Sequence, residues 1–250
     1  TVTEQAPLLA AQTDQAVSEL IDGVLVYPET NTLEYSQGGL RFTTTLGSVD
    51  LGMQYFTGFL SEPVIALDLQ NLTPASLDAA VSFNRFHQAG LDAAAVLGPY
   101  ALRAEAALKL TEDFEGDDPL VYNPSLAWSL GFDRSLISTL TLNLQGNGTY
   151  RLYDDKVGSE AGDIESGRDL TKTRFTLLLS QSLFQDRFEW ELGALYGLED
   201  EDFLIMPALI FAVGDAELKA AAGIFGGASA GELGQFSDNC YVKIGMNYSF

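Results

Sequence analysis

The sequence predicts an all-β protein and, more specifically, a transmembrane up-and-down antiparallel β-barrel of at least twelve strands. Three observations lead to this fold class. Apolar and polar residues alternate with a period of two from residue 32 to residue 250, which is typical of strands with one apolar and one polar face. The alternating segments are mostly about ten residues or longer, enough to cross a bilayer at a tilt. Tight turns and long polar connections follow one another in strict alternation along the chain.

Individual segments make the alternation clear. Between Ser138 and Leu152 the even positions from 140 onward are leucine, glycine or tyrosine, and the odd positions are threonine, asparagine, glutamine or arginine. In the segment from Phe188 to Leu198, aromatic and aliphatic residues alternate with Glu189 and Glu191. The sequence predicts eleven strands, over residues 32–46, 49–61, 79–97, 100–112, 119–134, 137–152, 170–185, 188–198, 203–213, 216–226 and 239–250.

The connections between these strands predict a meander. The tight ones carry turn-forming residues and lie at Gly47-Ser48, Gly98-Pro99, around Ser135, at Gln185-Asp186-Arg187 and at Gly214-Asp215. The longer polar ones lie near residues 70–78, 113–119, 153–170, 199–202 and 226–238. A Greek-key sandwich would need long crossovers between sheets, so the alternation favours a simple up-and-down order.

The distribution of aromatic residues decides which face meets which solvent. A soluble barrel buries its apolar face and a membrane barrel turns it outward, so alternation alone does not separate them. Aromatic residues lie near both ends of the predicted strands, as in the two girdles of membrane barrels. Those near the tight turns are Tyr100, Phe132, Phe188, Trp190, Tyr248 and Phe250, and those near the long loops are Tyr122, Tyr150, Tyr196 and Phe203. We therefore expect the apolar face to contact lipid.

The last predicted strand carries the most specific pattern. Every even position from Cys240 to Phe250 is apolar or aromatic, and the sequence ends on Phe250. This strand resembles the C-terminal signature of bacterial outer-membrane β-barrel proteins of the porin-like family. The resemblance implies that the protein lies in the bacterial outer membrane, in contact with its lipids and lipopolysaccharide. It also implies that Tyr248 and Phe250 are read by the barrel assembly machinery, and that the long loops are extracellular.

Residues 1–31 differ from the barrel, which is predicted for residues 32–250. Thr13 to Gly23 has apolar residues at helical spacing, although Gly23–Tyr27 could instead form a strand. Bacterial single-chain barrels have even strand numbers, so a twelfth strand is expected before residue 32. It is either Gly23–Tyr27 with its flanks, or upstream sequence, in which case this chain is the C-terminal part of a larger barrel.

Acidic residues dominate the charge of the chain. It carries 35 acidic and 13 basic residues, a net charge of −22, which excludes nucleic acid as an expected partner. Three of the predicted long loops hold fifteen acids against Lys156 and Arg168, a net charge of −13. These acids are Glu112, Asp113, Glu115, Asp117, Asp118, Asp154, Asp155, Glu160, Asp163, Glu165, Asp169, Glu199, Asp200, Glu201 and Asp202. Three interpretations stay open: solvated extracellular loops, sites for divalent cations that bridge to lipopolysaccharide phosphates, or a surface that attracts cationic solutes.

The polar strand faces supply candidate pore-lining charges. In a channel such residues set ion selectivity, and in a small closed barrel they would pair and fill the interior. Small residues on the same face, such as Gly52, Ala107 and Gly245, favour the channel. The candidates are Arg41, Asp50, Asp92, Arg103, Glu105, Lys109, Arg151, Lys172, Arg174, Glu189, Glu191, Glu217, Lys219 and Lys243.

The sequence offers little for an enzyme. The outer-membrane hydrolases and acyltransferases of the resembled class use a histidine base, and His87 is the single histidine, on the apolar parity of its strand. One cysteine excludes a disulfide framework. We expect no catalytic residues and no cofactor. The predicted function is a porin-like channel for passive diffusion of small polar solutes, and the alternative is a non-conducting structural or adhesive barrel.

Overall fold

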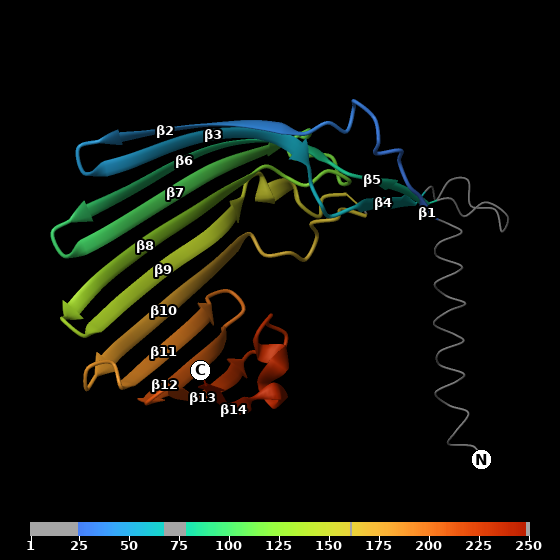
Figure 1. Cartoon of the computed structure of the whole chain (residues 1–250). Coiled ribbons are helices and arrows are strands. Elements are labelled where there is room, and N and C mark those ends of the chain that lie inside the picture. Colours follow the sequence, from blue (N-terminus) through green and yellow to red (C-terminus); the bar gives the residue numbers. More distant parts are fainter. Residues whose placement is uncertain (1–24, 68–78, 161, 249–250) are drawn as a thin grey trace, which may run out of the picture.

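The protein is described by a computed structural model over residues 25–67, 79–160 and 162–248. Eleven strands form one antiparallel sheet, shown in Figure 1. They are β2 (Gly38–Leu46), β3 (Val49–Phe59), β6 (Arg85–Leu97), β7 (Tyr100–Thr111), β8 (Ser125–Ile137), β9 (Leu140–Arg151), β10 (Thr171–Leu183), β11 (Phe188–Gly197), β12 (Asp202–Val213), β13 (Ala216–Gly227) and β14 (Tyr241–Tyr248). Each is paired with the next in this order, which confirms the predicted eleven-strand meander.

A second, three-stranded sheet lies at the long-loop end of the main sheet (Figure 1). It contains β1 (Leu25–Val26), β4 (Val64–Leu67) and β5 (Ala79–Ser82), with β1 parallel to β5. The prediction of one continuous strand over 79–97 is therefore wrong. Phe83 and Asn84 separate β5 from β6, because Asn84 turns to the neighbouring loop, where its side chain bonds the backbone of Leu120 and Tyr122.

The tight turns lie where the sequence predicts them, with one exception. Gly47, Gly98 and Gly214 have positive φ angles of 65°, 61° and 62°, which two-residue hairpin turns require. The predicted turn around Ser135 is wrong. The strand continues to Ile137 through an irregularity between Ser135 and Ile137, and the chain reverses at residues 138–139. The extra residue absorbed by this β-bulge moves the turn away from the position that simple alternation indicates.

Three other predicted strands begin later than expected. β2 starts at Gly38, after a turn in which the Tyr35 amide bonds the Thr32 carbonyl. β8 starts at Ser125, because residues 119–124 belong to a loop held by hydrogen bonds from Asn84 and Asn123. β14 starts at Tyr241, after the 3₁₀ segment η2 (Gly234–Asn239). The other short helix is η1 (Asp154–Lys156), and no helix in the described ranges is long and apolar enough to cross a membrane.

The two faces of the main sheet differ sharply. Large apolar side chains are exposed along one face, for example Leu40 at 81%, Leu144 at 42% and Ile244 at 80%. Among the described residues, the only buried aliphatic side chains are Val64, Val81 and Ala208, at 1%, 5% and 7% exposure, together with the ring of Pro124. The sheet therefore builds almost no apolar core of its own, and its apolar face is left to meet another apolar medium.

Aromatic side chains gather at both ends of the apolar face. At the turn end, Phe188 and Phe211 pack with ring centroids 4.7 Å apart. Nearby on the same face, the Trp190 indole donates a hydrogen bond of 3.0 Å to Gln181. At the loop end, the Tyr55 hydroxyl and His87 Nδ1 are 2.7 Å apart. The predicted aromatic residue Tyr122 lies in a loop instead of a strand.

The main sheet is open in this structure. β2 and β14 each have one neighbour among the described strands, so the predicted closed barrel of at least twelve strands is not what the described residues form. Gly23–Tyr27 was one candidate for the twelfth strand, but Leu25 and Val26 pair with β5 in the small sheet. β2 and β14 both run from the loop end to the turn end, because nine strands lie between them and each is antiparallel to the next. The predicted helix over 13–23 and the terminal Phe250 lie outside the described residues.

Candidate functional site

The polar face of the main sheet forms a hollow of about 490 Å³. The strand register produces it, since Asp92, Glu105, Ser129, Asn147 and Arg174 are successive partners across β6 to β10. Its polar lining is completed by Arg41, Gln54, Thr149, Lys172 and Glu232. The hollow thus gathers five of the predicted pore-lining charges: Arg41, Asp92, Glu105, Lys172 and Arg174.

One rim of the hollow is an ion pair that spans three strands. The Arg41 guanidinium lies 2.9 Å from both carboxylate oxygens of Asp92 and 3.3 Å from the Gln54 amide oxygen. Gly52 lies between the two strands, and a side chain there would occupy the space of the Asp92 carboxylate. The Arg41 side chain is 52% exposed, so the pair shapes the charged surface and adds little stability.

Further pairs continue along the same face toward the turn end. Arg103 bonds Asp133, and Asn143 donates to the same carboxylate. Lys219 lies 3.6 Å from Glu191. Two more predicted charges bond uncharged partners: Asp50 accepts from Thr45 at 2.6 Å, and Glu217 accepts from Asn247 at 3.4 Å.

The other predicted charges of this face have no carboxylate or amine partner. Glu105, Lys109, Glu189 and Lys243 make no ion pair within the described parts of the chain. The Lys109 ammonium lies 5.4 Å from the Phe86 ring centroid. The polar face therefore carries unpaired charges between stretches where charges are neutralised in pairs.

A loop residue reaches onto the polar face at the opposite rim of the hollow. Glu232 follows β13, yet its carboxylate bonds Lys172 and Arg174 on β10, the latter at 2.6 Å. We call this contact the Glu232 bridge. Asp202, which is fully buried, anchors the loop by accepting hydrogen bonds from the Leu233 and Gly234 amides. The two cations lower the pKa of Glu232, because their hydrogen bonds favour its charged form.

Arg151 belongs to a buried loop cluster and does not face the hollow. Its guanidinium bonds Asp154 and the carbonyls of Glu165 and Arg168, and it lies 3.8 Å from the Glu165 carboxylate. Both side chains are about nine-tenths buried, with Arg151 9% and Glu165 11% exposed. Burial raises the pKa of Glu165, although the Asn123 amide and Arg151 act in the other direction.

A second contact joins three loops at their surface. The Arg168 guanidinium lies 3.3 Å from the Glu62 carboxylate and 3.3 Å from the Tyr122 hydroxyl. The hydrogen bond to Tyr122 and the charge of Arg168 lower the pKa of Glu62, and burial raises the pKa of Tyr122. These contacts hold the 60–63, 119–124 and 153–170 segments together beside the hollow.

Several acids of the long loops organise the loop backbone. Asp113 accepts hydrogen bonds from the amides of Glu115, Gly116 and Asp118 at 2.8 to 3.1 Å. Glu199 accepts from the Thr173 amide at 2.6 Å and from the Thr171 hydroxyl. In the described ranges, no group of three or more acidic, histidine or cysteine side chains could hold a metal ion.

Three polar residues of this face, Glu232, Asp133 and Asn143, are not among the pore-lining residues predicted from the sequence. Asp133 and Asn143 have the right strand parity, so parity combined with pairing across neighbouring strands could have found them. Glu232 has no such signal, because it stands in a loop and reaches β10 only through the tertiary fold. His87 lies on the apolar face beside Tyr55, as its parity predicts.

Comparison with known proteins identifies a distantly similar solved structure. No family model matches the sequence, and no curated protein matches it either. Among solved structures, the crystal structure of the outer membrane channel DcaP of Acinetobacter baumannii is similar at 11% sequence identity, covering 86% of this chain and 85% of that chain. The TM-score is 0.37.

Proposed function

We propose that this protein is a porin-like channel of the bacterial outer membrane, through which small polar solutes diffuse passively. One observation carries the proposal: a long antiparallel sheet exposes a continuous apolar face on one side and a hollowed, charged face on the other. Lipid is the medium that suits the first face, and water with dissolved solutes suits the second. The charge pairs stay solvent-accessible along the sheet, which supports a lined passage.

A channel requires that the edges of β2 and β14 be paired, since an open sheet edge cannot lie in lipid. The two strands run in the same direction, so direct pairing would be parallel. One further strand, or another odd number of strands, would make every neighbour antiparallel, as in known single-chain barrels. We propose closure of this second kind, with Tyr248 and Phe250 on the strand that the assembly machinery reads.

Single-channel recording in planar lipid bilayers tests the proposal directly. A channel should give stepwise, ohmic currents after insertion of the folded protein. Insertion without any conductance, checked by protease protection of the same membranes, would instead support a structural or adhesive barrel.

The acidic loops should give the channel a modest preference for cations at low salt. The Debye length falls from about 30 Å at 0.01 M to about 3 Å at 1 M, so the preference should fade as salt rises. Glu112, Asp117, Asp155 and Glu160 are exposed and bond no backbone group of the described residues, which makes them suitable for joint replacement by amides. We expect this variant to lose part of the low-salt cation preference in reversal-potential measurements and to match the wild type at 1 M. Anion preference at low salt would show that the basic residues of the hollow dominate.

The Glu232 bridge should make the current depend on acid pH. The pKa of Glu232 is lowered from its ordinary value of 4.5, so the bridge is complete above that pH and is lost as pH falls through the lowered pKa. Loss of the bridge frees the loop from β10, and we expect the single-channel current to rise as the pH falls through the lowered pKa of Glu232. Glu232→Gln should carry the larger current already at neutral pH. Glu217→Gln, on the same face but outside the hollow, should behave like the wild type; an unchanged acid response in Glu232→Gln would contradict the role of the bridge.

A further inference from the structure

The apolar face of the main sheet carries only two charged side chains within its described strands. They are Arg85 at the loop end and Arg134 at the turn end. Arg85 is satisfied within the protein, because it donates to the Glu34 carbonyl and lies 4.4 Å from the Phe59 ring centroid. Arg134 is different, since no carboxylate or carbonyl among the described residues accepts a bond from it.

The surroundings of Arg134 are aromatic and apolar. Its guanidinium lies 4.8 Å from the Tyr100 ring centroid, and Tyr100 packs on Phe132 at 5.8 Å. The Arg134 Nε atom is buried and has no hydrogen-bond partner within the described protein. A guanidinium in such a place is costly unless an anion bonds it from outside the chain.

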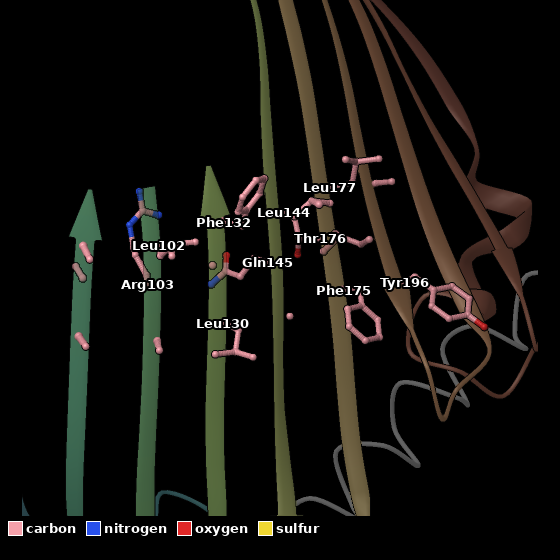
Figure 2. Close-up of a pocket in the computed structure, with 18 residues that line it drawn as sticks. Leu102, Arg103, Leu130, Phe132, Leu144, Gln145, Phe175, Thr176, Leu177 and Tyr196 are labelled. Carbon is pink, nitrogen blue, oxygen red and sulfur yellow. The ribbon is translucent and has the colours of Figure 1, made fainter. Parts of the chain in front are cut away.

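An apolar hollow of about 650 Å³ begins two residues along the strand from Arg134. Small residues widen it, among them Ala93, Ala104, Gly146 and Ala194. Figure 2 shows the large side chains around it, with Leu130 and Phe132 on β8 and Phe175 on β10, on either side of β9. Two residues of a strand span about 7 Å, so a molecule with an anionic head on Arg134 could lay an apolar chain in this hollow.

We propose that Arg134, Tyr100 and the adjoining hollow bind one glycerophospholipid, with its phosphate on Arg134 and an acyl chain between Phe132 and Phe175. This inference rests on the proposed function, because it needs the apolar face to lie in lipid. Arg134 is at the turn end, so the lipid belongs to the leaflet on the turn side. Lipopolysaccharide is expected in the opposite leaflet, beside the long loops.

A second copy of the chain is a poorer occupant. It would have to offer a carboxylate to Arg134 from its own apolar face, and the strands of that face carry none in the described residues. The phosphate of a phospholipid provides the missing charge together with the apolar chain.

Native mass spectrometry of the full chain in detergent micelles, titrated with phosphatidylglycerol, tests the site. The wild type should retain one phospholipid, and Arg134→Gln should bind it about tenfold more weakly, as expected for loss of a charge-assisted hydrogen bond. Arg134→Lys should recover part of the affinity. Ala104→Phe, which fills the hollow and keeps Arg134, should also weaken binding. Arg187→Gln removes a cation from the neighbouring tight turn and should bind like the wild type.

A parallel measurement separates this site from the proposed function. Trp128 and Trp190 are the two tryptophans of the chain, and both lie on the apolar face. Vesicles of phospholipid brominated on its acyl chains should quench the fluorescence of the two tryptophans, in the wild type and equally in Arg134→Gln. If the tryptophans are quenched but the wild type and Arg134→Gln retain phospholipid equally in mass spectrometry, the lipid site is overturned and the membrane placement stands. Absence of quenching overturns both, and a dimer that Arg134→Gln dissociates would identify a second copy as the occupant.

Discussion

Replacing Leu144 with arginine should destabilise the protein in lipid bilayers, lowering its free energy of unfolding by about 2–4 kcal/mol. This is the cost of placing a cation at the middle of the lipid face of a barrel. Leu144 lies in the interior of β9 on the apolar face and is partly exposed. Urea-induced unfolding from vesicles, followed by tryptophan fluorescence, measures the change.

The neighbouring residue provides the matched control. Gln145 points to the polar face, where its side chain bonds the Ser129 hydroxyl at 3.3 Å. Gln145→Arg should therefore change the free energy by less than about 1 kcal/mol, since it costs one exposed hydrogen bond. Equal effects of the two substitutions would contradict the assignment of the faces, and the reverse order would indicate a soluble protein.

Replacing Arg151 with methionine should destabilise the loop cluster by about 3–5 kcal/mol, because it leaves the Glu165 carboxylate buried without its cation. Hydrogen exchange at the Asn123 amide reports this locally, since that amide donates to Glu165 at 2.8 Å. Burial already raises the pKa of Glu165, so the variant should recover stability as pH falls and the carboxyl is protonated.

Two further variants separate the buried charge from the loss of packing. Arg151→Met combined with Glu165→Gln should recover much of the lost stability, because the buried carboxylate is then gone and the other partner of Arg151, Asp154, is 40% exposed. Arg168→Met removes the exposed pair with Glu62, in which the two side chains are 51% and 63% exposed, and should cost less than about 1 kcal/mol. A large effect of Arg168→Met would mean that the surface contact, and not the Arg151 cluster, holds the loops.

Alternation with period two was sufficient to locate the eleven strands of the main sheet and to assign their faces. Residues such as Leu144 and Gln145 carry this information locally, because successive side chains of a strand point to opposite faces whatever the neighbours are. The glycines at positions 47, 98 and 214 likewise mark their turns through the backbone angles that they permit. The bulge near Ser135 interrupts the period, and there the local pattern placed the turn wrongly.

Tertiary structure alone decided the features that join residues distant along the chain. The pairing of Leu25 and Val26 with β5, the contact of Glu232 with β10 and the burial of Arg151 beside Glu165 depend on how loops fold over the ends of the sheet. Loop residues have no fixed period, so their sequence does not indicate which strand they meet. The position of Arg134 is of the same kind. Its parity places it on the apolar face, but only the packed structure reveals that its Nε atom has no hydrogen-bond acceptor among the described residues.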